Sequence, residues 1–226
     1  MPFLREFAHD PRTVGAVAPS GPALARAATA VVPGTGSPVV VELGPGTGAF
    51  TGPIQRRLAG RGRHIAVEVN VRFARRLAVS LPGVEVVHAD ASDLAEVLAR
   101  RGLGRADVVV SGLPWAAFTG DRRHAVLSAV VASLPPHGVF TTFAYVHARW
   151  MPPARRLHAE LRSRFDEVVV GRTVWANLPP ALVYYCRRPV AEPGRPVRAL
   201  AGAERGGDGP LTGRGSAWDH APWIPK

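Results

Sequence analysis

The sequence predicts an α/β fold, in which a seven-stranded, mostly parallel sheet has helices on both faces and ends in an antiparallel hairpin. Two observations predict it. Between residues 39 and 165, short apolar runs alternate with helical stretches, as they do in repeated βα units. The last two apolar runs are separated by too few residues for a crossover helix, so they should pair antiparallel.

The expected elements follow this pattern in order along the chain. Strands are predicted at residues 39–43, 65–69, 84–88, 106–111, 138–145, 167–174 and 181–187. Helices are expected between them at residues 50–58, 73–80, 94–101, 122–134 and 154–165. The turn ANLPP, residues 176–180, joins the last two strands.

Two further helices are expected ahead of the sheet. Phe3, Leu4 and Phe7 form one apolar side of a short first helix. A second helix begins near Ser20, whose side chain suits an N-cap, with Pro22 in its first turn. Beyond residue 188 the chain is rich in Gly and Pro without a sustained periodic pattern, which predicts a largely disordered tail.

The composition narrows the classes of protein to consider. Hydrophobic residues make up 46% of the chain and charged residues 20%, which is ordinary for a globular domain. No run approaches the roughly 18 apolar residues of a membrane span, and the charged residues near the start argue against a secretory signal. The single cysteine, Cys186, excludes an intramolecular disulfide, suits a reducing cytoplasm and lies in an apolar stretch typical of a core.

The formal net charge of +11 favours an anionic partner, either a nucleic acid or an acidic membrane surface. A compositional explanation is equally open. Almost every basic residue is arginine, and the abundance of Ala, Gly, Pro and Val is typical of a GC-rich genome. The histidines are scattered without metal-ligand spacing, so no metal site is expected.

The motif ELGPGTG, residues 42–48, directly follows the first predicted strand. Gly44, Gly46 and Gly48 let the backbone turn tightly and approach a ligand without a Cβ in the way. Ligands of open α/β sheets bind beyond the carboxyl ends of the strands, where this loop lies. A P-loop is excluded because no Gly-Lys-Ser/Thr follows, but the spacing to Ala49 satisfies the relaxed dinucleotide fingerprint. NAD and S-adenosylmethionine therefore both remain candidates at this point.

Acidic residues at or just after three successive strands separate these two ligands. Glu42 would repel a pyrophosphate but can hold the ammonium group of a sulfonium ligand. Glu68, at the end of the second strand, can accept hydrogen bonds from both ribose hydroxyls, as it also would in an NAD enzyme. Asp90, just past the third strand, can accept one from the adenine N6 amine. The combination favours S-adenosylmethionine over three unrelated surface acids.

The motifs ELGPGTG, AVEVN, HADASDL and SGLPW, in this order, resemble the S-adenosylmethionine-dependent methyltransferases of the rRNA adenine dimethylase superfamily. The segments FLREFAHDPRTVGAVAPSGPALAR, SGLPW and ANLPPALVYY further resemble the bacterial phospholipid N-methyltransferases. The resemblance spans residues 3–187 and implies the class I methyltransferase (Rossmann-like) fold with S-adenosyl-L-methionine as the cofactor. The cofactor site that it implies comprises Glu42, Gly44, Gly46, Gly48, Glu68, Asp90, Ala91 and Ser111.

The resemblance also implies a division of the chain into three segments. Residues 1–37 would form an N-terminal helical cap that contacts the membrane, and residues 38–188 the S-adenosylmethionine-binding methyltransferase domain. Residues 189–226 would be the disordered tail.

Gly112, Leu113, Pro114 and Trp115 stand where the nucleic-acid branch has an Asn-x-Pro-Tyr type motif that holds a flipped adenine. Gly112 lacks the amide of that motif, which weakens the adenine hypothesis. Trp115 can stack on a base, and it can equally wall an alkylammonium pocket through cation–π contact. Residues 112–114 are expected to line the substrate side of the site.

The expected catalytic residues are Trp115, Tyr145 and Asn177. Tyr145, at the end of the fifth strand, should point across the same cleft as Trp115, with a core position as the alternative. Asn177 lies near the active site by resemblance, although a hairpin turn needs no function from it. Arg12 and Ser20 should cover the cofactor or contact a lipid phosphate, with simple helix capping as the alternative for Ser20.

Together these features predict a cytoplasmic enzyme, peripheral on the inner face of the cell membrane, that N-methylates the amine headgroup of a phospholipid such as phosphatidylethanolamine. The first alternative is an rRNA or other nucleic-acid adenine N6-methyltransferase. The charge and superfamily favour it, but Gly112 and the lack of a predicted helical C-terminal domain do not. The second is a small-molecule methyltransferase of secondary metabolism on the same scaffold, since a fold alone does not separate such functions.

Overall fold

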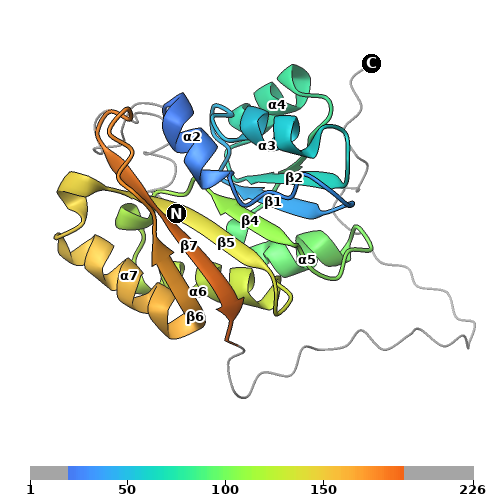
Figure 1. The fold of residues 1–226 in the computed structure, drawn as a ribbon. Coiled ribbons are helices and arrows are strands. Elements are labelled where there is room, and N and C mark those ends of the chain that lie inside the picture. The colour runs from blue at the N-terminus through green and yellow to red at the C-terminus, as the bar shows by residue number, and fades with distance from the viewer. Residues whose placement is uncertain (1–19, 191–226) are drawn as a thin grey trace, which may run out of the picture. The chain divides into compact units, whose positions relative to one another are not determined.

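The computed structural model of the protein describes residues 20–190, which form a sheet covered by helices (Figure 1). The predicted first helix with Phe3, Leu4 and Phe7, the candidate residue Arg12, and the predicted tail from residue 191 onward lie outside the described residues. The seven-stranded α/β architecture predicted from the sequence is confirmed.

The sheet has the strand order β3-β2-β1-β4-β5-β7-β6. The first five strands along the chain run parallel, and β7 is antiparallel to both β5 and β6. Since helices cover both faces, the central strands are almost wholly apolar and buried, as in the VVVS segment of β4. The strands are β1 Val39–Leu43, β2 Arg63–Glu68, β3 Glu85–His88, β4 Val108–Ser111, β5 Val139–Tyr145, β6 Phe165–Val170 and β7 Ala181–Pro189.

The final hairpin confirms the predicted antiparallel pair but differs in its place and length. Strand β7 lies between β5 and β6, which makes β6 an edge strand. Strand β6 ends at Val170 instead of Val174, because the chain leaves the ladder after Gly171 and only Val174 pairs again, with Ala181.

The helices divide between the two faces of the sheet (Figure 1). Helices α2 (Pro22–Ala28), α3 (Thr51–Leu58) and α4 (Val71–Ser80) cover one face. Helices α5 (Leu94–Ala99), α6 (Gly120–Ala132) and α7 (Pro152–Arg164) cover the other. Three short 3₁₀ turns, η1 (Ala91–Asp93), η2 (Trp115–Ala117) and η3 (Val146–Ala148), follow β3, β4 and β5 respectively.

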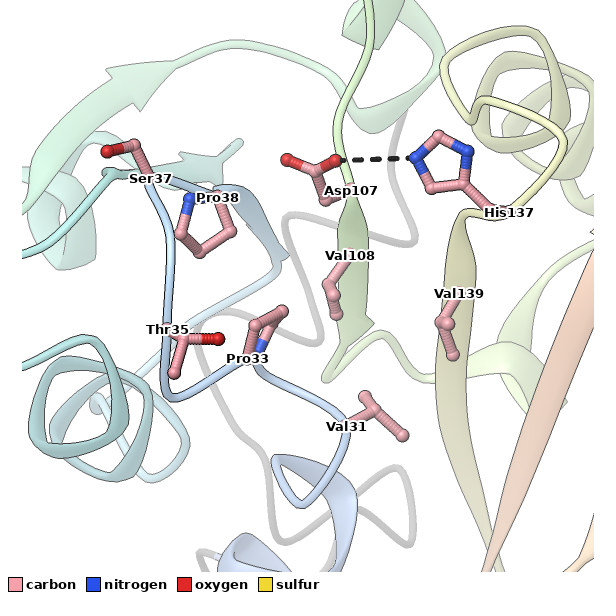
Figure 2. A pocket seen from close by; sticks show the side chains of 9 residues that line it. All are labelled: Val31, Pro33, Thr35, Ser37, Pro38, Asp107, Val108, His137 and Val139. Carbon is pink, nitrogen blue, oxygen red and sulfur yellow. Dashed lines mark ion pairs between the residues drawn. The ribbon is translucent and has the colours of Figure 1, made fainter.

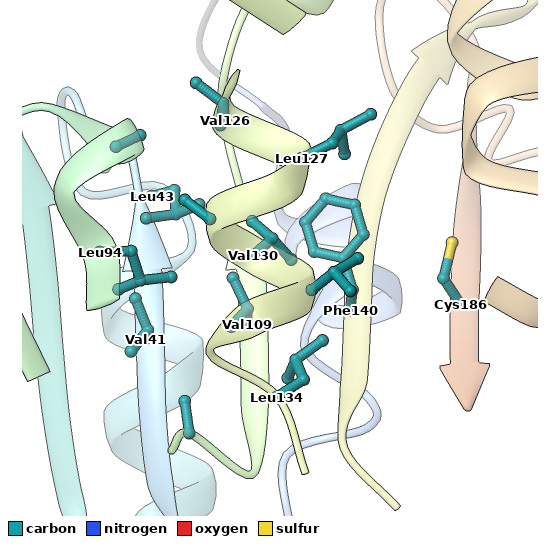
Figure 3. Close-up of a cluster of buried hydrophobic side chains, with 14 of the residues drawn as sticks. Val41, Leu43, Leu94, Val109, Val126, Leu127, Val130, Leu134, Phe140 and Cys186 are labelled. Atoms are coloured by element: carbon teal, nitrogen blue, oxygen red, sulfur yellow. The ribbon is translucent and has the colours of Figure 1, made fainter. Parts of the chain in front are cut away.

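The larger part of the core lies between the sheet and helices α5, α6 and α7, where Figure 3 shows α6 at its centre. Val126, Leu127 and Val130 of α6 are fully buried there against Phe140 of β5. Cys186 belongs to the same cluster, as expected, and burial raises the pKa of its thiol to about 12. The thiol therefore stays protonated at neutral pH and acts as a small apolar residue.

The start of α2 corrects one sequence expectation. The N-cap is Gly21, not Ser20. Glycine has no side chain that could accept a hydrogen bond from a helical N–H. The Gly21 N–H instead donates to Oδ1 of Asn177, at 2.8 Å. A side chain from the distant β6–β7 loop thus takes the place of a local cap, while Pro22 is the first helical residue, as predicted.

Candidate active site

The candidate site lies where the parallel strands end at a common edge of the sheet. The strand order reverses between β1 and β4, which are neighbours although they are not consecutive in the chain. Ligands of open α/β sheets bind in the crevice at such a switch point. The loops that follow β1 and β4, residues 44–50 and 112–119, therefore stand on either side of the expected site.

The glycine loop after β1 leaves room for a ligand. Gly44, Gly46 and Gly48 have φ values of 66°, 55° and 87°, a region that other residues rarely adopt. A Cβ built on Gly46 would meet no atom within 4 Å, whereas one built on Gly44 would lie 2.7 Å from Cδ2 of Leu113. Gly44 thus lets two loops pack together, and Gly46 faces open space that a ligand can occupy.

Glu68, at the end of β2, contacts this loop directly. Its Oε2 accepts a hydrogen bond from the Gly46 N–H at 3.0 Å, and its Oε1 accepts one from the Asn70 N–H at 2.8 Å. The side chain is buried, and burial raises its pKa although these backbone hydrogen bonds oppose the shift. The structure therefore brings the second predicted acid against the loop, with acceptor capacity left on both oxygens.

Glu42 is fully buried in β1, beside His64 of β2. The His64 Nε2 lies 3.2 Å from Oε2 of Glu42, but it is not aligned as a hydrogen bond. Nε2 of Gln55 lies 2.8 Å from the other ring nitrogen of His64, Nδ1. Among residues 20–190, both Glu42 oxygens lack a hydrogen-bond partner. Buried acceptors of this kind are costly unless a donor reaches them.

Asp90 is held by contacts that the sequence did not indicate. It caps η1, where its Oδ1 accepts from the N–H and the hydroxyl of Ser92 at 2.8 and 2.6 Å. Its Oδ2 accepts from Nη2 of Arg122 at 2.5 Å, and the Arg122 guanidinium also lies 5.6 Å from the ring centroid of Phe118. Burial opposes the charge of Asp90, but the hydrogen bonds from Arg122 and Ser92 outweigh it and lower the pKa. Ala91, the next candidate, is buried at the start of η1.

The SGLPW segment packs against the glycine loop at close range. The Gly112 N–H donates to the Leu43 carbonyl at 2.8 Å, and a Cβ on Gly112 would lie only 2.7 Å from the Gly44 carbonyl oxygen. The buried Ser111 hydroxyl accepts from Nε1 of Trp115 at 3.2 Å and from the Leu113 N–H at 3.3 Å. Position 112 therefore holds glycine because no side chain fits there. Pro114 precedes η2 in the same loop.

The side chain of Trp115 does not wall an open pocket, which corrects the expectation for this residue. It is 3% exposed and packs edge-on against Phe118 and Phe140, with centroid distances of 5.5 and 6.2 Å. Since its indole N–H is satisfied by Ser111, the ring is stable inside the core on the α5–α7 face.

Tyr145 lies on the opposite face of the sheet from Trp115, so the two rings do not share one cleft as predicted. The Tyr145 ring packs edge-on against Phe143 at 5.5 Å and stacks on His147 at 5.8 Å. Phe143 in turn packs edge-on against Phe50, which directly follows the glycine loop, at 5.9 Å. This row of rings connects Tyr145 to Phe50, at the end of the glycine loop. Burial raises the pKa of the Tyr145 hydroxyl to about 12.

Asn177 is buried, and both ends of its amide are used within the protein. Its Oδ1 accepts from the Gly21 N–H, and its Nδ2 donates to the Pro179 carbonyl at 2.7 Å. These contacts join the β6–β7 loop to the start of α2. The neighbouring candidate Ser20 is half-buried beside this junction.

A hollow at the other edge of the sheet is distinct from this site (Figure 2). It lies at the amino ends of β4 and β5, where Asp107 and His137 face each other with 3.8 Å between Oδ1 and Nε2. Asp107 also accepts from the Val39 N–H at 2.7 Å. The glycine loop and Glu68 lie at the carboxyl ends of the strands, so this hollow is separate from them.

Residues 20–190 contain no group of three or more His, Cys, Asp or Glu side chains placed to hold a metal ion. None of their helices has both the length and the apolar character that crossing a bilayer requires.

Comparison with known proteins agrees with this geometry, although no protein-family model matches the chain. Among solved structures, the 16S rRNA N2 methyltransferase of T. thermophilus in complex with AdoMet and guanosine superposes with a TM-score of 0.55 at 22% identity, covering 78% of this chain and 41% of the other. Human methyltransferase-like protein 13 in complex with SAH gives a TM-score of 0.53 at 19% identity, with coverages of 79% and 82%. At these identities the superpositions establish the fold.

A curated relative establishes the family. The Ornithine lipid N-methyltransferase of Singulisphaera acidiphila is 35% identical over 191 residues, which cover 82% of this chain and 94% of the relative. The fold, the glycine loop and the acids at the strand ends all suit the cofactor of such an enzyme. The chain therefore belongs to the family of this lipid N-methyltransferase, within the class I methyltransferases, and is an enzyme that uses S-adenosyl-L-methionine.

Proposed function

We propose that the enzyme methylates the amine nitrogen of a lipid headgroup. The name of the relative supports a lipid amine as the acceptor, and phosphatidylethanolamine and ornithine lipid both offer a primary amine. The proposal places the working enzyme at a membrane surface on the cytoplasmic side, with residues 38–188 as the methyltransferase domain.

The observation that carries the proposal is the contact between Gly112 and Gly44. Methylation of an adenine amine in this superfamily uses an amide side chain at the first position of the motif after β4. In this protein a side chain there would collide with the Gly44 carbonyl oxygen at 2.7 Å. An alkyl amine needs no such amide, since it carries a basic lone pair of its own once it is neutral. The geometry thus favours an aliphatic amine over an adenine.

Several residues would hold the cofactor. Glu68 would accept the ribose hydroxyls while keeping its bond to Gly46, and Asp90 would accept the adenine amine while Arg122 fixes its carboxylate. The space beside Gly46 would take the methionine part, whose ammonium group Glu42 balances. When bound, S-adenosylmethionine would supply a methyl group whose carbon accepts the lone pair of a neutral amine, while the C–S bond breaks and the sulfur leaves as a neutral thioether.

Tyr145 is the side chain that we propose to orient the acceptor amine. With a pKa raised to about 12, its hydroxyl stays protonated at physiological pH. It is therefore a poor general base but a good neutral hydrogen-bonding partner. Tyr145 is the last residue of β5, which pairs with β4, the strand that leads into SGLPW. Its ring contacts Phe143, which in turn contacts Phe50.

The proposal is tested by incubating the protein with S-adenosylmethionine labelled in its methyl group and four acceptors kept in separate reactions. These are vesicles containing phosphatidylethanolamine, vesicles containing ornithine lipid, vesicles of phosphatidylcholine alone, and bulk rRNA. Label in the lipid fraction of the first or second reaction is expected, whereas phosphatidylcholine has no free amine to accept it. Free ethanolamine and ornithine in parallel reactions separate a lipid acceptor from a small molecule. Labelled rRNA with unlabelled lipid would overturn the proposal.

A further inference from the structure

Four large apolar side chains project into solvent near the end of β5. Trp150 is 73% exposed, Met151 54%, Trp175 75% and Leu178 82%. Exposed apolar residues are common singly, but two tryptophans and a leucine at this degree of exposure are not. Large apolar side chains that are exposed in one region of a surface indicate an interaction site.

The four residues come from two loops that lie together. Trp150 and Met151 follow η3 after β5, and Trp175 and Leu178 lie in the loop between β6 and β7. The Val146 N–H at the start of η3 donates to the Pro180 carbonyl of the other loop at 2.8 Å. Both loops stand at the carboxyl edge of β5, the edge that also holds the glycine loop (Figure 1). We call these four side chains the apolar rim.

The loops that carry the apolar rim are held in place by the hydrogen bonds of the fold. Asn177, between Trp175 and Leu178, is buried and bonded to Gly21 and Pro179. The Val174 N–H donates to the Ala181 carbonyl at 2.7 Å. The outward direction of the neighbouring side chains therefore follows from an anchored backbone.

The surroundings of the apolar rim are basic. Residues 145–159 and 170–180 contain no Asp or Glu. They contain four exposed arginines, Arg149, Arg155, Arg156 and Arg172. The Arg149 guanidinium lies 4.4 Å from the centroid of the Trp150 ring, so a cation and an aromatic face are presented together. Apolar rings beside exposed arginines complement a lipid surface, which has anionic phosphates over an apolar interior.

We propose that the apolar rim docks the enzyme on an anionic lipid bilayer, with the tryptophans and Leu178 at the level of the headgroups and the four arginines on lipid phosphates. Tryptophan favours this interface because its ring is apolar and its N–H is polar. The inference deepens the proposed function and rests on it for one step, that the docked edge is the one at which a lipid amine enters the site.

The test measures sedimentation of the full-length protein with vesicles of phosphatidylcholine containing increasing phosphatidylglycerol, which carries no amine. Binding should rise with the anionic fraction and fall with salt. Trp150→Ser/Trp175→Ser/Leu178→Ser should weaken binding by about tenfold or more. Arg155→Gln/Arg156→Gln should weaken it by roughly fivefold or more at low salt. Affinity for S-adenosylmethionine should stay unchanged in both variants.

Matched controls come from α4, at the other end of the sheet. Val79 is 66% exposed, and Arg75 and Arg76 are an exposed pair of consecutive helical arginines. Val79→Ser and Arg75→Gln/Arg76→Gln should leave vesicle binding near that of the wild type. Equal losses in the control and test arginine variants would mean that total charge alone binds the vesicles, which would overturn the docking surface.

Further outcomes separate the surface from the proposed function. If the triple variant binds vesicles as the wild type does, the inference fails. A loss of thermal stability or of rRNA binding with unchanged vesicle binding would mean that the apolar rim serves another contact. If vesicle binding falls as expected but no lipid amine is methylated in any reaction, the proposed function fails while the docking surface stands. With both correct, the triple variant should lose methylation of lipid in vesicles and keep it for lipid dispersed in detergent micelles.

Discussion

Gly112 lies so close to Gly44 that a Cβ on the first would stand 2.7 Å from the carbonyl oxygen of the second. The loops after β1 and β4 therefore meet backbone to backbone at the switch point of the sheet. A position that looked in the sequence like a lost functional amide is a packing requirement of the fold. The glycine loop and the SGLPW loop consequently pack directly against each other, and changes at either glycine should affect both.

Gly112→Ala should destabilise the protein by about 1–3 kcal/mol, because its methyl group must displace the backbone at Gly44. Affinity for S-adenosylmethionine should fall as well, since the displaced loop is the one that Glu68 contacts. Urea unfolding and calorimetric titration measure the two effects. Gly104→Ala is the control, because a Cβ there meets nothing within 4 Å. Wild-type stability and affinity in Gly112→Ala would contradict the packing argument.

Gly46→Val should remove cofactor binding while the protein stays folded, because the new side chain fills the space that the ligand needs. Gly46 has a positive φ of 55°, so valine also introduces backbone strain of about 1–3 kcal/mol. Gly36→Val controls for that strain, since Gly36 has a φ of 72° and equally open surroundings. Both variants should lose similar thermal stability, and only Gly46→Val should lose calorimetric binding. Near-wild-type affinity in Gly46→Val would place the cofactor elsewhere.

Glu68→Ala should weaken S-adenosylmethionine binding by about 1–3 kcal/mol, the usual cost of losing hydrogen bonds to a charged group. Glu96→Ala on α5 is the control, since Glu96 is exposed and pairs with Arg100, the C-cap residue of its own helix. An unchanged affinity in Glu68→Ala, measured by calorimetry, would remove Glu68 from the cofactor site.

The raised pKa of Glu68 gives this residue opposite pH effects on stability and on binding. A carboxyl group with a raised folded-state pKa contributes stability that is present below its unfolded pKa and is lost as the pH rises through the folded value. Cofactor affinity should instead rise over that window, above pH 4.5, as the carboxylate that accepts the ribose hydroxyls forms. Glu68→Gln should flatten both profiles, measured by unfolding and by calorimetry. Unaltered profiles in Glu68→Gln would contradict this assignment.

Asn177→Ala should lower the free energy of unfolding by about 1–3 kcal/mol, because it leaves the Gly21 N–H and the Pro179 carbonyl without their partner. Asn177→Asp keeps the acceptor but buries a carboxylate whose second oxygen faces the Pro179 carbonyl, so it should cost at least as much. If the residue is structural, the kcat of the folded fraction should stay within a few-fold of the wild type. A large loss of kcat with unchanged stability would support the catalytic role predicted from the sequence.

Tyr145→Phe should lower kcat for methyl transfer about 10–100-fold and spare S-adenosylmethionine affinity, since only the hydroxyl that orients the acceptor is removed. Because burial raises the pKa of this hydroxyl to about 12, its ionisation should leave no step in the rate profile between pH 6 and about 10. Tyr185→Phe is a control on the next strand, where the hydroxyl donates to the Ala27 carbonyl at 2.9 Å and its loss should mainly affect stability. Wild-type kcat in Tyr145→Phe would exclude the proposed role.

The elements of the sheet were predictable because each depends on residues close together in the chain. Strand β1 begins and ends where its apolar run does, and the glycine loop follows at once. Glu68 and Asp90 could be proposed as site residues for the same reason, since each lies at or just after the end of a strand. The antiparallel final pair followed from the length of one turn.

The contacts that complete the site were decided by the tertiary structure. Asn177 caps a helix at Gly21, 156 positions away, and Arg122 holds Asp90 across 32 positions. No local pattern relates such residues, because the order of the strands and the face that each helix covers bring them together.

The sequence by itself therefore determined the α/β fold, and it predicts the end of the sheet at which we expect the cofactor to bind. Only the tertiary structure decided that Trp115 is enclosed on one face while Tyr145 packs on the other. The physical reason is that periodicity shows which side chains are buried, whereas their partners depend on how the whole sheet is covered.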